Sequence, residues 1–440
     1  MQKDMRYCLD LFKSADRLLT VKREVRPEFE LPSLMKEAEK MAKAVFFTKV
    51  KNSSFPVVNN LFGSREMLAL LFETKPAHVV NEWIERTAKP VAPKTVSAGP
   101  VKEVIKKASE VNLDELPLVT HCTKDAGPYI SAGIVIAKDP ETGARNVSIN
   151  RMQYKGKNKL GIRMMPPQHL GLIQEKAEKR GKDLEIAVAI GNHPFETLVA
   201  STTVAFGADE FSLSSALRKE PLELVKCETV DLEVPATAEI ILEGIVPAGV
   251  REAEGPFGDF MQYYVPVMEN HVFEVKAMTC RKHAIYQTIQ ASSLEDVHLL
   301  ALSREAQVYQ AVSRIADVQA VCLVPTILSC MISIRKKFEG EPKNVAAAAL
   351  GAYSWLKYCV VVDHDVNVFD TNDVWWAMAT RSTPETGLLS MNHALGFPRD
   401  PFNIHQSKLG IDATAPLGQW QEFERKMVPG AGTIRIEDYM

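Results

Sequence analysis

The chain has 440 residues, of which 46% are hydrophobic and 24% are charged, so it is long and apolar enough for two or three packed domains and is not a disordered protein. Its 52 Lys and Arg nearly balance 55 Asp and Glu, which leaves a net charge of −3. This balance gives no electrostatic reason to expect a nucleic acid or an anionic membrane as a partner, and it favours a small polar substrate.

The start of the chain and its cysteines indicate a cytoplasmic protein. The first 30 residues carry charges every few positions and contain neither the apolar segment nor the small-residue cleavage site of a secretory signal. No apolar run approaches the roughly 18 residues that a membrane helix requires. The seven cysteines are scattered without a close CxxC pair, so we expect them to be small buried hydrophobes rather than disulfides or zinc ligands.

Residues 1–110 alternate helical and strand patterns, which predicts an N-terminal α/β domain. Residues 31–41 have the periodicity of an amphipathic helix, and residues 44–50 are rich in types that favour strands. Residues 89–100 contain three prolines and no helical period, which is typical of a linker.

Strand signals dominate residues 111–310. The β-branched segments 132–137, 184–190 and 238–246 are bounded by Gly, Pro or Asp, which favours a mixed or antiparallel β domain. One helix is expected within it, after Pro166-Pro167, because proline suits a first helical turn. His169 would then lie where backbone N–H groups have no partner.

A second α/β domain is expected over residues 311–440. Residues 324–334 are largely apolar, a helix is expected around 344–350, and residues 359–363 have the composition of a strand. The segment 406–414 is rich in residues that favour turns.

The most unusual short segment is Glu254-Gly-Pro-Phe-Gly-Asp259, in which a turn can bend two carboxylates toward one cavity. Two acids in different environments titrate apart, so one can stay ionised while the other holds a proton to deliver. The alternative is a solvated acidic turn.

A polar strand is expected over residues 145–154, with Arg151 facing away from Asn146, Ser148 and Asn150. An arginine beside two acids can keep one of them ionised and can also hold a substrate carboxylate through paired hydrogen bonds. The alternative for Arg151 is a surface ion pair.

Asn146, His169 and Glu210 together offer an amide oxygen, an imidazole and a carboxylate. Such a mixed set suits Mn²⁺ or Mg²⁺ better than a metal that prefers thiolates. Their wide spacing forms no compact ligand motif, so a capping histidine and a surface glutamate are the alternative.

Several segments, taken in order, carry a family resemblance. They are Asn146-Val-Ser-Ile-Asn-Arg151-Met-Gln, the helix start Gln168-His169, Gly207-Ala-Asp-Glu210, residues 225–244, Glu254-Gly-Pro-Phe-Gly-Asp259, Val361-Val-Asp-His-Asp-Val and Ser407-Lys-Leu-Gly-Ile-Asp412. Together they closely resemble the UbiD-type decarboxylases, which use prenylated FMN. The resemblance runs from about residue 5 to 415, and the order of the motifs makes it far more specific than any single one.

The resemblance implies a flavin anchored through a metal ion. Asn146, His169 and Glu210 match the positions that hold a divalent ion, usually manganese, against the flavin phosphate, and a potassium ion is expected near Glu210. A phosphate at a helix N-terminus, bridged by a hard cation, agrees with the electrostatics of such a terminus. By the same matching, the residues that bind the cofactor are Ile149, Asn150, Arg151, Arg163, Met164, Met165, Gln168, His169 and Lys408.

Arg151, Glu254 and Asp259 resemble the catalytic triad of the family. The resemblance implies that the flavin supplies an electron sink for the loss of carbon dioxide and that Asp259 donates the replacing proton. Arg151 would orient the substrate carboxylate, and Glu254 would tune Arg151 and Asp259 electrostatically.

Two departures from some relatives bear on the substrate. Asn150 often corresponds to an aromatic residue, and a smaller, more polar loop commonly follows the acid where this chain has Phe260-Met261-Gln262. His298 falls in a region that lines the substrate pocket in related enzymes and could bond a polar group on a ring, or it could pack on a helix face. These residues motivate a preference for furan-like, pyrrole-like or hydroxybenzoate-like acids.

The fold implied by the resemblance is an N-terminal α/β domain (1–110), a central flavin-binding domain like a split β-barrel (111–310) and a C-terminal α/β oligomerisation domain (311–440). We expect a homodimer or homohexamer, a flavin prenyltransferase as supplier of the cofactor, and a small aromatic or α,β-unsaturated carboxylic acid as substrate. Decarboxylation of a phenolic or ubiquinone-precursor acid, carboxylation in the reverse direction, a flavin- or metal-binding protein without turnover, and a hydrolase that uses metal-bound water are the alternatives.

Overall fold

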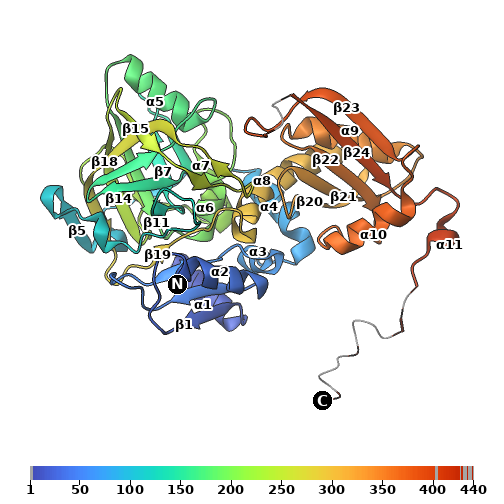
Figure 1. The fold of residues 1–440 in the computed structure, drawn as a ribbon, viewed down its shortest axis with the longest axis horizontal. Coiled ribbons are helices and arrows are strands. Elements are labelled where there is room, and N and C mark those ends of the chain that lie inside the picture. The colour runs from blue at the N-terminus through green and yellow to red at the C-terminus, as the bar shows by residue number, and fades with distance from the viewer. Residues whose placement is uncertain (1–2, 402–404, 427, 430–433, 435–438, 440) are drawn as a thin grey trace. The chain divides into compact units, whose positions relative to one another are not determined.

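The computed structural model describes residues 3–401, 405–426, 428–429, 434 and 439, and it mixes helices and strands as the sequence predicts (Figure 1). The chain divides into two compact units. Unit 1 comprises residues 1–306 and 324–326, and unit 2 comprises residues 307–323 and 327–440.

The first part of unit 1 is a small α/β layer. Its four-stranded sheet has the order β1-β2-β3-β19. The helix expected at 31–41 and the strand expected at 44–50 are α2 and β2. The elements are α1 (Met5–Ser14), β1 (Leu18–Val21), α2 (Glu30–Lys40), β2 (Ala44–Phe47), β3 (Val57–Asn59), α3 (Arg65–Phe72), α4 (Val79–Thr87) and β19 (Tyr286–Gln287).

A ten-stranded sheet forms the centre of unit 1, with the main order β6-β9-β10-β18-β14-β11-β7-β8 and with β15 and β5 also paired to β18. The three β-branched segments of the sequence fall in β7, β11 and β14. The strands are β5 (Val104–Lys107), β6 (Tyr129–Ile130), β7 (Ile134–Lys138), β8 (Arg145–Ile149), β9 (Met152–Gly156), β10 (Lys159–Ile162), β11 (Leu184–Ile190), β14 (Ile240–Val246), β15 (Arg251–Glu254) and β18 (Met268–Cys280).

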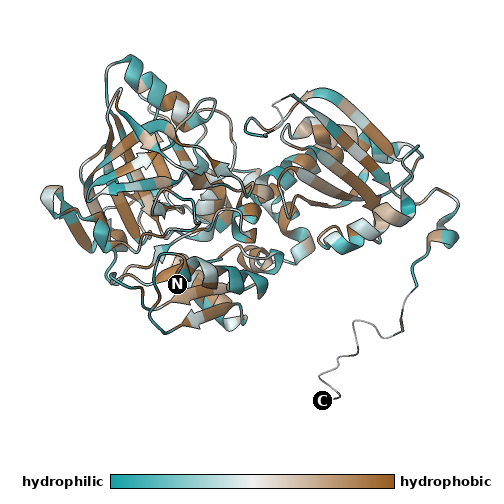
Figure 2. Cartoon of the chain, viewed as in Figure 1, coloured by the Kyte–Doolittle hydropathy of each residue, from teal (hydrophilic) through white to brown (hydrophobic). Residues whose placement is uncertain are grey.

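The middle strands of this sheet are buried on both faces, and many of their residues are hydrophobic (brown in Figure 2). Along β11, Ile186 and Val188 belong to one apolar core, while Ala187 and Ala189 belong to another. Successive side chains of a strand point to opposite faces, so burial of both faces produces an unbroken apolar run rather than an alternating one.

The sheet curves back on itself. β8 and β9 lie near opposite ends of the strand order, yet only Asn150 and Arg151 separate them in the chain. Two residues can span no more than about 10 Å, so the ends of the sheet must approach each other. The predicted split barrel is therefore observed, and Arg151 lies at the seam of the barrel.

Helices and small sheets complete unit 1. The helix expected after the two prolines is α5 (His169–Lys179), which begins after Pro166-Pro167 rather than with them, since Gln168 is its N-cap. The others are α6 (Pro194–Ala200), α7 (Glu210–Arg218), the sheet of β4 (Lys94–Thr95), β12 (Glu223–Lys226) and β13 (Glu233–Pro235), and the hairpin of β16 (Phe257–Gly258) and β17 (Tyr264–Val265). Short 3₁₀ helices lie at Pro76–His78, Pro100–Lys102, Ala108–Glu110 and Leu113–Glu115.

Unit 2 is a five-stranded sheet of order β20-β21-β22-β24-β23. Its helices α9 and α10 cover one face, because Gly410 of β24 packs on Ala346 of α9 and Asp363 of β22 bonds Arg381 of α10. The elements are β20 (Asp317–Cys322), β21 (Ser329–Arg335), α9 (Glu341–Ala352), β22 (Tyr358–Asp363), α10 (Thr371–Arg381), β23 (Leu388–Leu395), β24 (His405–Ala413) and α11 (Trp420–Phe423), and the helix α8 (Leu294–Val312) contains the boundary between the units.

One local expectation differs from the structure. Residues 406–414, which are rich in turn formers, lie almost entirely in the strand β24. This strand pairs with β22 on one side and with β23 on the other, so two ladders of hydrogen bonds override the local preference for turns.

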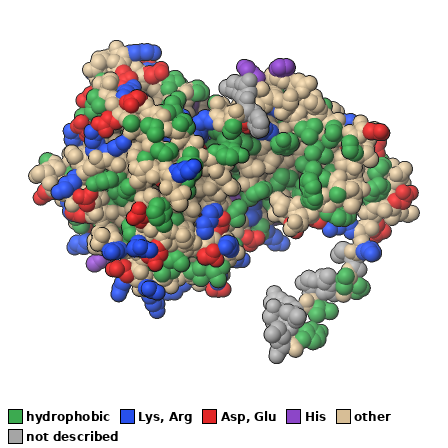
Figure 3. Space-filling model, in the orientation of Figure 1, with side chains coloured by type: hydrophobic (Ala, Val, Ile, Leu, Met, Phe, Trp, Pro, Cys, Tyr) green, Lys and Arg blue, Asp and Glu red, His purple; other side chains and the backbone are tan. Residues whose placement is uncertain are grey.

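The surface agrees with the balanced composition. On the face in Figure 3, acidic and basic side chains are interspersed, and no large patch of one sign appears. Among the residues that the structure describes, every helix is too short or too polar to cross a membrane.

Candidate active site

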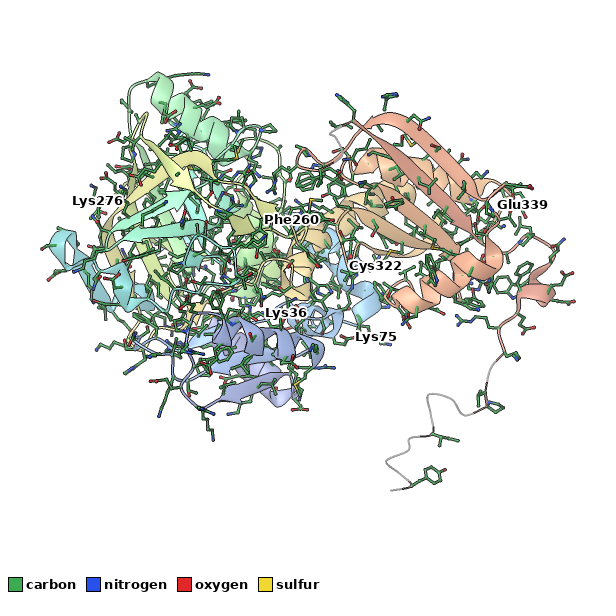
Figure 4. All side chains as sticks on the ribbon, viewed as in Figure 1. Lys36, Lys75, Phe260, Lys276, Cys322 and Glu339 are labelled. Atoms are coloured by element: carbon green, nitrogen blue, oxygen red, sulfur yellow. The ribbon has the colours of Figure 1, made fainter. Side chains whose placement is uncertain are left out.

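The two carboxylates of the 254–259 segment occupy different structural positions. Glu254 is the last residue of β15, and Asp259 follows β16 at the start of the loop that leads to β17. We call residues 255–265 the acid hairpin, and Phe260, labelled in Figure 4, marks its tip. The segment is therefore a strand end followed by a hairpin, rather than a solvated turn.

Glu254 and Arg151 form a paired contact at the barrel seam. Arg151 Nε lies 3.1 Å from Glu254 Oε1, and its Nη2 lies 3.2 Å from Oε2. The side chain of Glu254 is only 1% exposed, and Asn270 Nδ2 donates a further hydrogen bond of 2.8 Å to Oε2. These donors compensate the carboxylate for its removal from water, which is otherwise costly.

Two aromatic side chains enclose this ion pair. The guanidinium carbon of Arg151 lies 4.9 Å from the centre of the Phe257 ring, and the Tyr129 ring lies 4.6 Å from that of Phe257. Burial, reinforced by the charge of Glu254, raises the pKa of Tyr129 above its ordinary value, so its hydroxyl remains a neutral donor.

Asp259 lies on the acid hairpin, just after β16. Its Oδ1 accepts a hydrogen bond of 2.6 Å from the backbone N–H of Phe260. The loop is closed by the bonds Asp259 N to Tyr263 O and Gln262 N to Asp259 O, both 2.9 Å. Arg151 and Glu254 are thus in direct contact, and Asp259, the third member of the predicted triad, follows Glu254 on the adjoining hairpin.

Most of the predicted flavin-binding segments lie together. Asn150 Nδ2 donates to the carbonyl of Arg163 at 3.2 Å, and Arg163 Nε lies 3.1 Å from Met165 Sδ. The partly exposed Ile149 precedes Asn150 on β8. Met164 is 2% exposed and packs in the apolar core.

The predicted metal ligands come from three elements. Glu210 begins α7, and its Oε2 accepts a hydrogen bond of 2.8 Å from the backbone N–H of Val147, which places it beside Asn146 on β8. His169 begins α5, after the exposed Gln168, and packs edge-on against Phe206 with 5.1 Å between ring centres.

The environment of these ligands fits a cation. Burial raises the pKa of Glu210 to about 7, against the effect of the backbone N–H groups that it accepts. Asn146 is 5% exposed, and its Nδ2 has no hydrogen-bond partner. The buried carboxylate of Glu210 and the neighbouring amide oxygen of Asn146 are ligands that a hard cation prefers, whereas the unpaired Nδ2 is a donor that needs an acceptor such as a phosphate oxygen. No cluster of three or more His, Cys, Asp or Glu in the described part of the chain offers a different metal site.

Two further predicted site residues, His298 and Lys408, have neighbours other than the predicted triad and metal ligands. His298 on α8 is buried, and burial lowers its pKa to about 4, with Glu305 and Arg65 as its charged neighbours. Lys408 on β24 belongs to unit 2, where its amine donates to the carbonyls of Leu350 at 3.1 Å and Ser354 at 2.7 Å, at the end of α9.

The structure adds residues that the sequence analysis missed. Asn270 reaches Glu254 because β15 pairs antiparallel with β18, with Glu252 opposite Asn270. Asp296 lies on the first turn of α8; removal of its carboxyl from water raises its pKa to about 7, and the charge of Asp259 adds to the effect. Asp125 accepts one hydrogen bond from the acid hairpin, donated by the backbone N–H of Gly258. Only the strand register and tertiary packing bring these residues to the site, so no local motif could have identified them.

Three family models match consecutive parts of the chain. They are the N-terminal domain of 3-octaprenyl-4-hydroxybenzoate carboxy-lyase over residues 9–87, its Rift-related domain over residues 94–293 and its C-terminal domain over residues 297–413. The matches cover most of the chain in the order expected from its motifs.

Individual proteins match over nearly their full length. The anhydromevalonate phosphate decarboxylase of Methanothermobacter thermautotrophicus is 38% identical, with 96% of this chain and 99% of that protein covered. The phenolic acid decarboxylase of Sedimentibacter hydroxybenzoicus is 33% identical, with 94% and 92% covered. The structure of the UbiD-class enzyme HmfF from Pelotomaculum thermopropionicum in complex with FMN has a TM-score of 0.94 at 42% identity, with 99% and 100% covered. The chain therefore belongs to the UbiD family and is a decarboxylase of the UbiD class.

Proposed function

We propose that the protein catalyses the reversible, non-oxidative decarboxylation of an aromatic, heteroaromatic or α,β-unsaturated carboxylic acid with prenylated FMN. The observation that carries this proposal is the buried Arg151–Glu254 pair at the barrel seam, followed by the hairpin that bears Asp259. The similar HmfF has been solved with FMN and, in an evolved dimeric form, with prenylated FMN, which supports the choice of cofactor.

The chain offers residues that would hold this cofactor. The adjacent segments 149–151 and 163–165 would contact the flavin. Asn146, His169 and Glu210 would bind Mn²⁺ or Mg²⁺ against its phosphate, with K⁺ close to Glu210, and Gln168 completes the proposed set within unit 1. When bound, prenylated FMN supplies an electron sink for the carbon from which carbon dioxide departs.

The residues of the triad have separate roles in this proposal. Arg151 binds the substrate carboxylate through its guanidinium, which the charge and geometry of Glu254 hold in place. The carbon–carboxylate bond breaks with its electron pair left on carbon, and carbon dioxide leaves. Asp259 then transfers its proton to that carbon and recovers a proton from water.

Both residues that motivate a preference for a heteroaromatic acid, His298 and Asn150, have protein neighbours of their own. His298 is buried beside Glu305 and Arg65, and Asn150 already bonds Ser148 Oγ at 2.8 Å and the Arg163 carbonyl. A panel of substrates should therefore include heteroaromatic, phenolic and cinnamic acids, together with a phosphorylated unsaturated acid of the kind named for the archaeal relatives.

The setting of the reaction is part of the proposal. We place the protein in the cytoplasm as a homodimer or homohexamer, with a flavin prenyltransferase as the supplier of the cofactor. The scattered cysteines support a reducing compartment, and the evolved dimeric form of the similar HmfF supports an oligomer. Size-exclusion chromatography with light scattering measures the oligomeric state.

The test of the cofactor is its mass and absorbance after purification. Protein produced together with a flavin prenyltransferase should contain prenylated FMN and should release carbon dioxide from at least one acid of the panel. Protein produced without the transferase should carry unmodified FMN and be inactive. Absence of prenylated flavin under both conditions would contradict the proposal, and activity with metal alone would favour a hydrolase.

A further inference from the structure

The acid hairpin is held from outside rather than by its own strands. β16 and β17 contain two residues each and pair only with one another. Such a short hairpin is not stable by itself, and a side chain at its tip would have no fixed position. Something else must therefore hold the backbone on both sides of Asp259.

The loop 122–126 supplies these contacts. The backbone N–H of Gly258 donates to Asp125 Oδ1 at 2.8 Å, and the N–H of Ala126 donates to the carbonyl of Pro256 at 2.9 Å. On the other strand, the N–H of Lys124 donates to the hydroxyl of Tyr264 at 3.2 Å. We call residues 122–126 the bracing loop, because it bonds both strands of the acid hairpin.

Asp125 links the two segments through both oxygens of its carboxylate. Oδ1 accepts from Gly258, the residue immediately before Asp259, and Oδ2 accepts from the N–H of Cys122 within the bracing loop at 2.8 Å. Burial raises the pKa of Asp125, while these N–H groups and the charge of Arg151 oppose the rise and favour the ionised form. Asp125 thus lies near enough to sense Arg151, although it does not belong to the triad.

Close packing adds a second constraint at the same point. A β-carbon placed on Gly258 would lie 3.0 Å from Cys122 Sγ and 3.5 Å from Cys122 Cβ. A separation of 3.0 Å forces one of the two groups to move, whereas 3.5 Å is an ordinary contact. The absence of a side chain at position 258 therefore allows the hairpin and the bracing loop to approach closely.

We propose that Asp125 is a positioning residue for the proton transfer: through Gly258 it fixes the backbone that presents the carboxyl group of Asp259. This inference rests on the proposed function, in which Asp259 is the proton donor. A displacement of about 1 Å of a reacting group can slow a reaction by about 10²-fold. Loss of the hydrogen bond between Asp125 and Gly258 would let the backbone before Asp259 move, and a shift of that size in the Asp259 carboxyl would slow proton transfer to the same extent.

The first test is Asp125→Asn in holoenzyme. The amide retains one acceptor oxygen and turns an N–H group toward a backbone donor, so one of the two bonds is lost. We expect kcat to fall by about 10²-fold, while KM changes less than about threefold because Arg151 still binds the carboxylate. Asp183→Asn is the matched control, since exposed Asp183 accepts one backbone N–H, that of Ala248 at 2.9 Å, and should leave kcat unchanged.

Three further measurements identify the affected step. The solvent deuterium isotope effect on kcat should increase about twofold in Asp125→Asn, because proton transfer becomes slower than bond cleavage. Carbon dioxide should appear in a burst of one equivalent per site before slow turnover. Hydrogen exchange of the amides of residues 257–260 should accelerate while the thermal midpoint stays within about 2 °C of wild type. A purely structural role would lower the midpoint and leave the isotope effect unchanged.

Gly258→Ala provides a second test that does not alter Asp125. The added methyl should push the hairpin away from Cys122 Sγ and lower kcat with the same rise in isotope effect. Cys122→Ala in the same chain removes the sulfur and should restore most of the rate. Wild-type kcat in Asp125→Asn, or failure of Cys122→Ala to rescue Gly258→Ala, would overturn the proposal. If no acid is decarboxylated by wild-type holoenzyme, the proposed function fails, whereas the hydrogen-exchange result still shows whether Asp125 braces the hairpin.

Discussion

The two glutamates of β15 differ in burial and in their hydrogen-bond partners. Glu252 and Glu254 are two positions apart on β15, yet Glu252 is partly exposed and pairs with Lys159, while Glu254 is buried and accepts from Arg151 and Asn270. The sequence shows acids two positions apart on one strand, and the structure shows that only Glu254 is buried against Arg151.

Asp259→Asn tests the proton donor directly. The amide cannot deliver a proton, so turnover should fall by at least about 10³-fold, whereas the flavin content should remain near that of wild type. Glu252→Gln is the control, because its partner Lys159 is a surface residue and its loss should change kcat less than about twofold. Substantial turnover by Asp259→Asn would remove Asp259 from this role.

Asp296 should make the stability of the protein depend on pH. Its folded-state pKa of about 7 lies above the value of about 3.9 in an unfolded chain, so the folded state holds the proton more tightly. Below about pH 4 the carboxyl group therefore does not lower the free energy of unfolding. As the pH rises toward 7, it lowers that free energy by an increasing amount, to at most about 4 kcal/mol before screening by water is considered.

The measurement is urea unfolding of wild type and Asp296→Asn between pH 5 and pH 8. The variant should gain stability relative to wild type as the pH rises, with no further gain above the folded-state pKa. A difference that stays constant with pH would show that Asp296 does not titrate in this range. Asp183→Asn again serves as an exposed control.

At the scale of elements, the sequence predicted what local patterns determine. The helix at 31–41 and the strands at 184–190 and 359–363 were recognisable because helical periodicity and β-branched residues identify such elements within a short stretch of sequence. β24 was not, because its partners β22 and β23 decide its conformation. For the same reason Arg151 and Glu254 could be proposed from the sequence, whereas Asn270 and Asp125 required the strand register and the loop contacts.

The pairing of β14 with β18 depends on one glycine. The register shifts between Glu243 and Gly244, and a β-carbon on Gly244 would lie 1.9 Å from the carbonyl oxygen of Glu274. Gly244→Ala should therefore destabilise the protein by about 3 kcal/mol or more, measured by urea unfolding. Gly351→Ala near the end of α9 meets no neighbour and should be neutral or stabilise by up to about 1 kcal/mol.

At the scale of the whole molecule, the two units can be observed separately. The chain has five tryptophans, and four of them, Trp355, Trp375, Trp376 and Trp420, belong to unit 2. Tryptophan fluorescence therefore reports mainly on unit 2, while flavin absorbance would report on the site in unit 1. A mutation that destabilises unit 2 should shift the unfolding transition seen by tryptophan fluorescence more than the one seen by flavin absorbance.

Arg381 allows this separation to be tested. Its side chain is 1% exposed, donates to Asp363 at 2.9 Å and to Asp365 at 2.7 Å, and lies 5.0 Å from the ring of Trp376. Arg381→Met leaves Asp363 buried without its cation, which should cost about 3–5 kcal/mol and lower the urea midpoint of the fluorescence transition. Arg425→Met, which removes the more exposed partner of Asp373, should cost less than about 1 kcal/mol. Equal effects of the two changes would contradict this account.

The way in which the acid hairpin is held has a consequence for how such enzymes diversify. The bracing loop bonds the backbone at Pro256 and Gly258 and the side-chain hydroxyl of Tyr264, all of which lie outside residues 260–263. Side chains at these tip positions can therefore change without disturbing the attachment of the proton donor. A lineage could acquire a new substrate by exchanging four residues at the tip while it inherits the reaction chemistry intact.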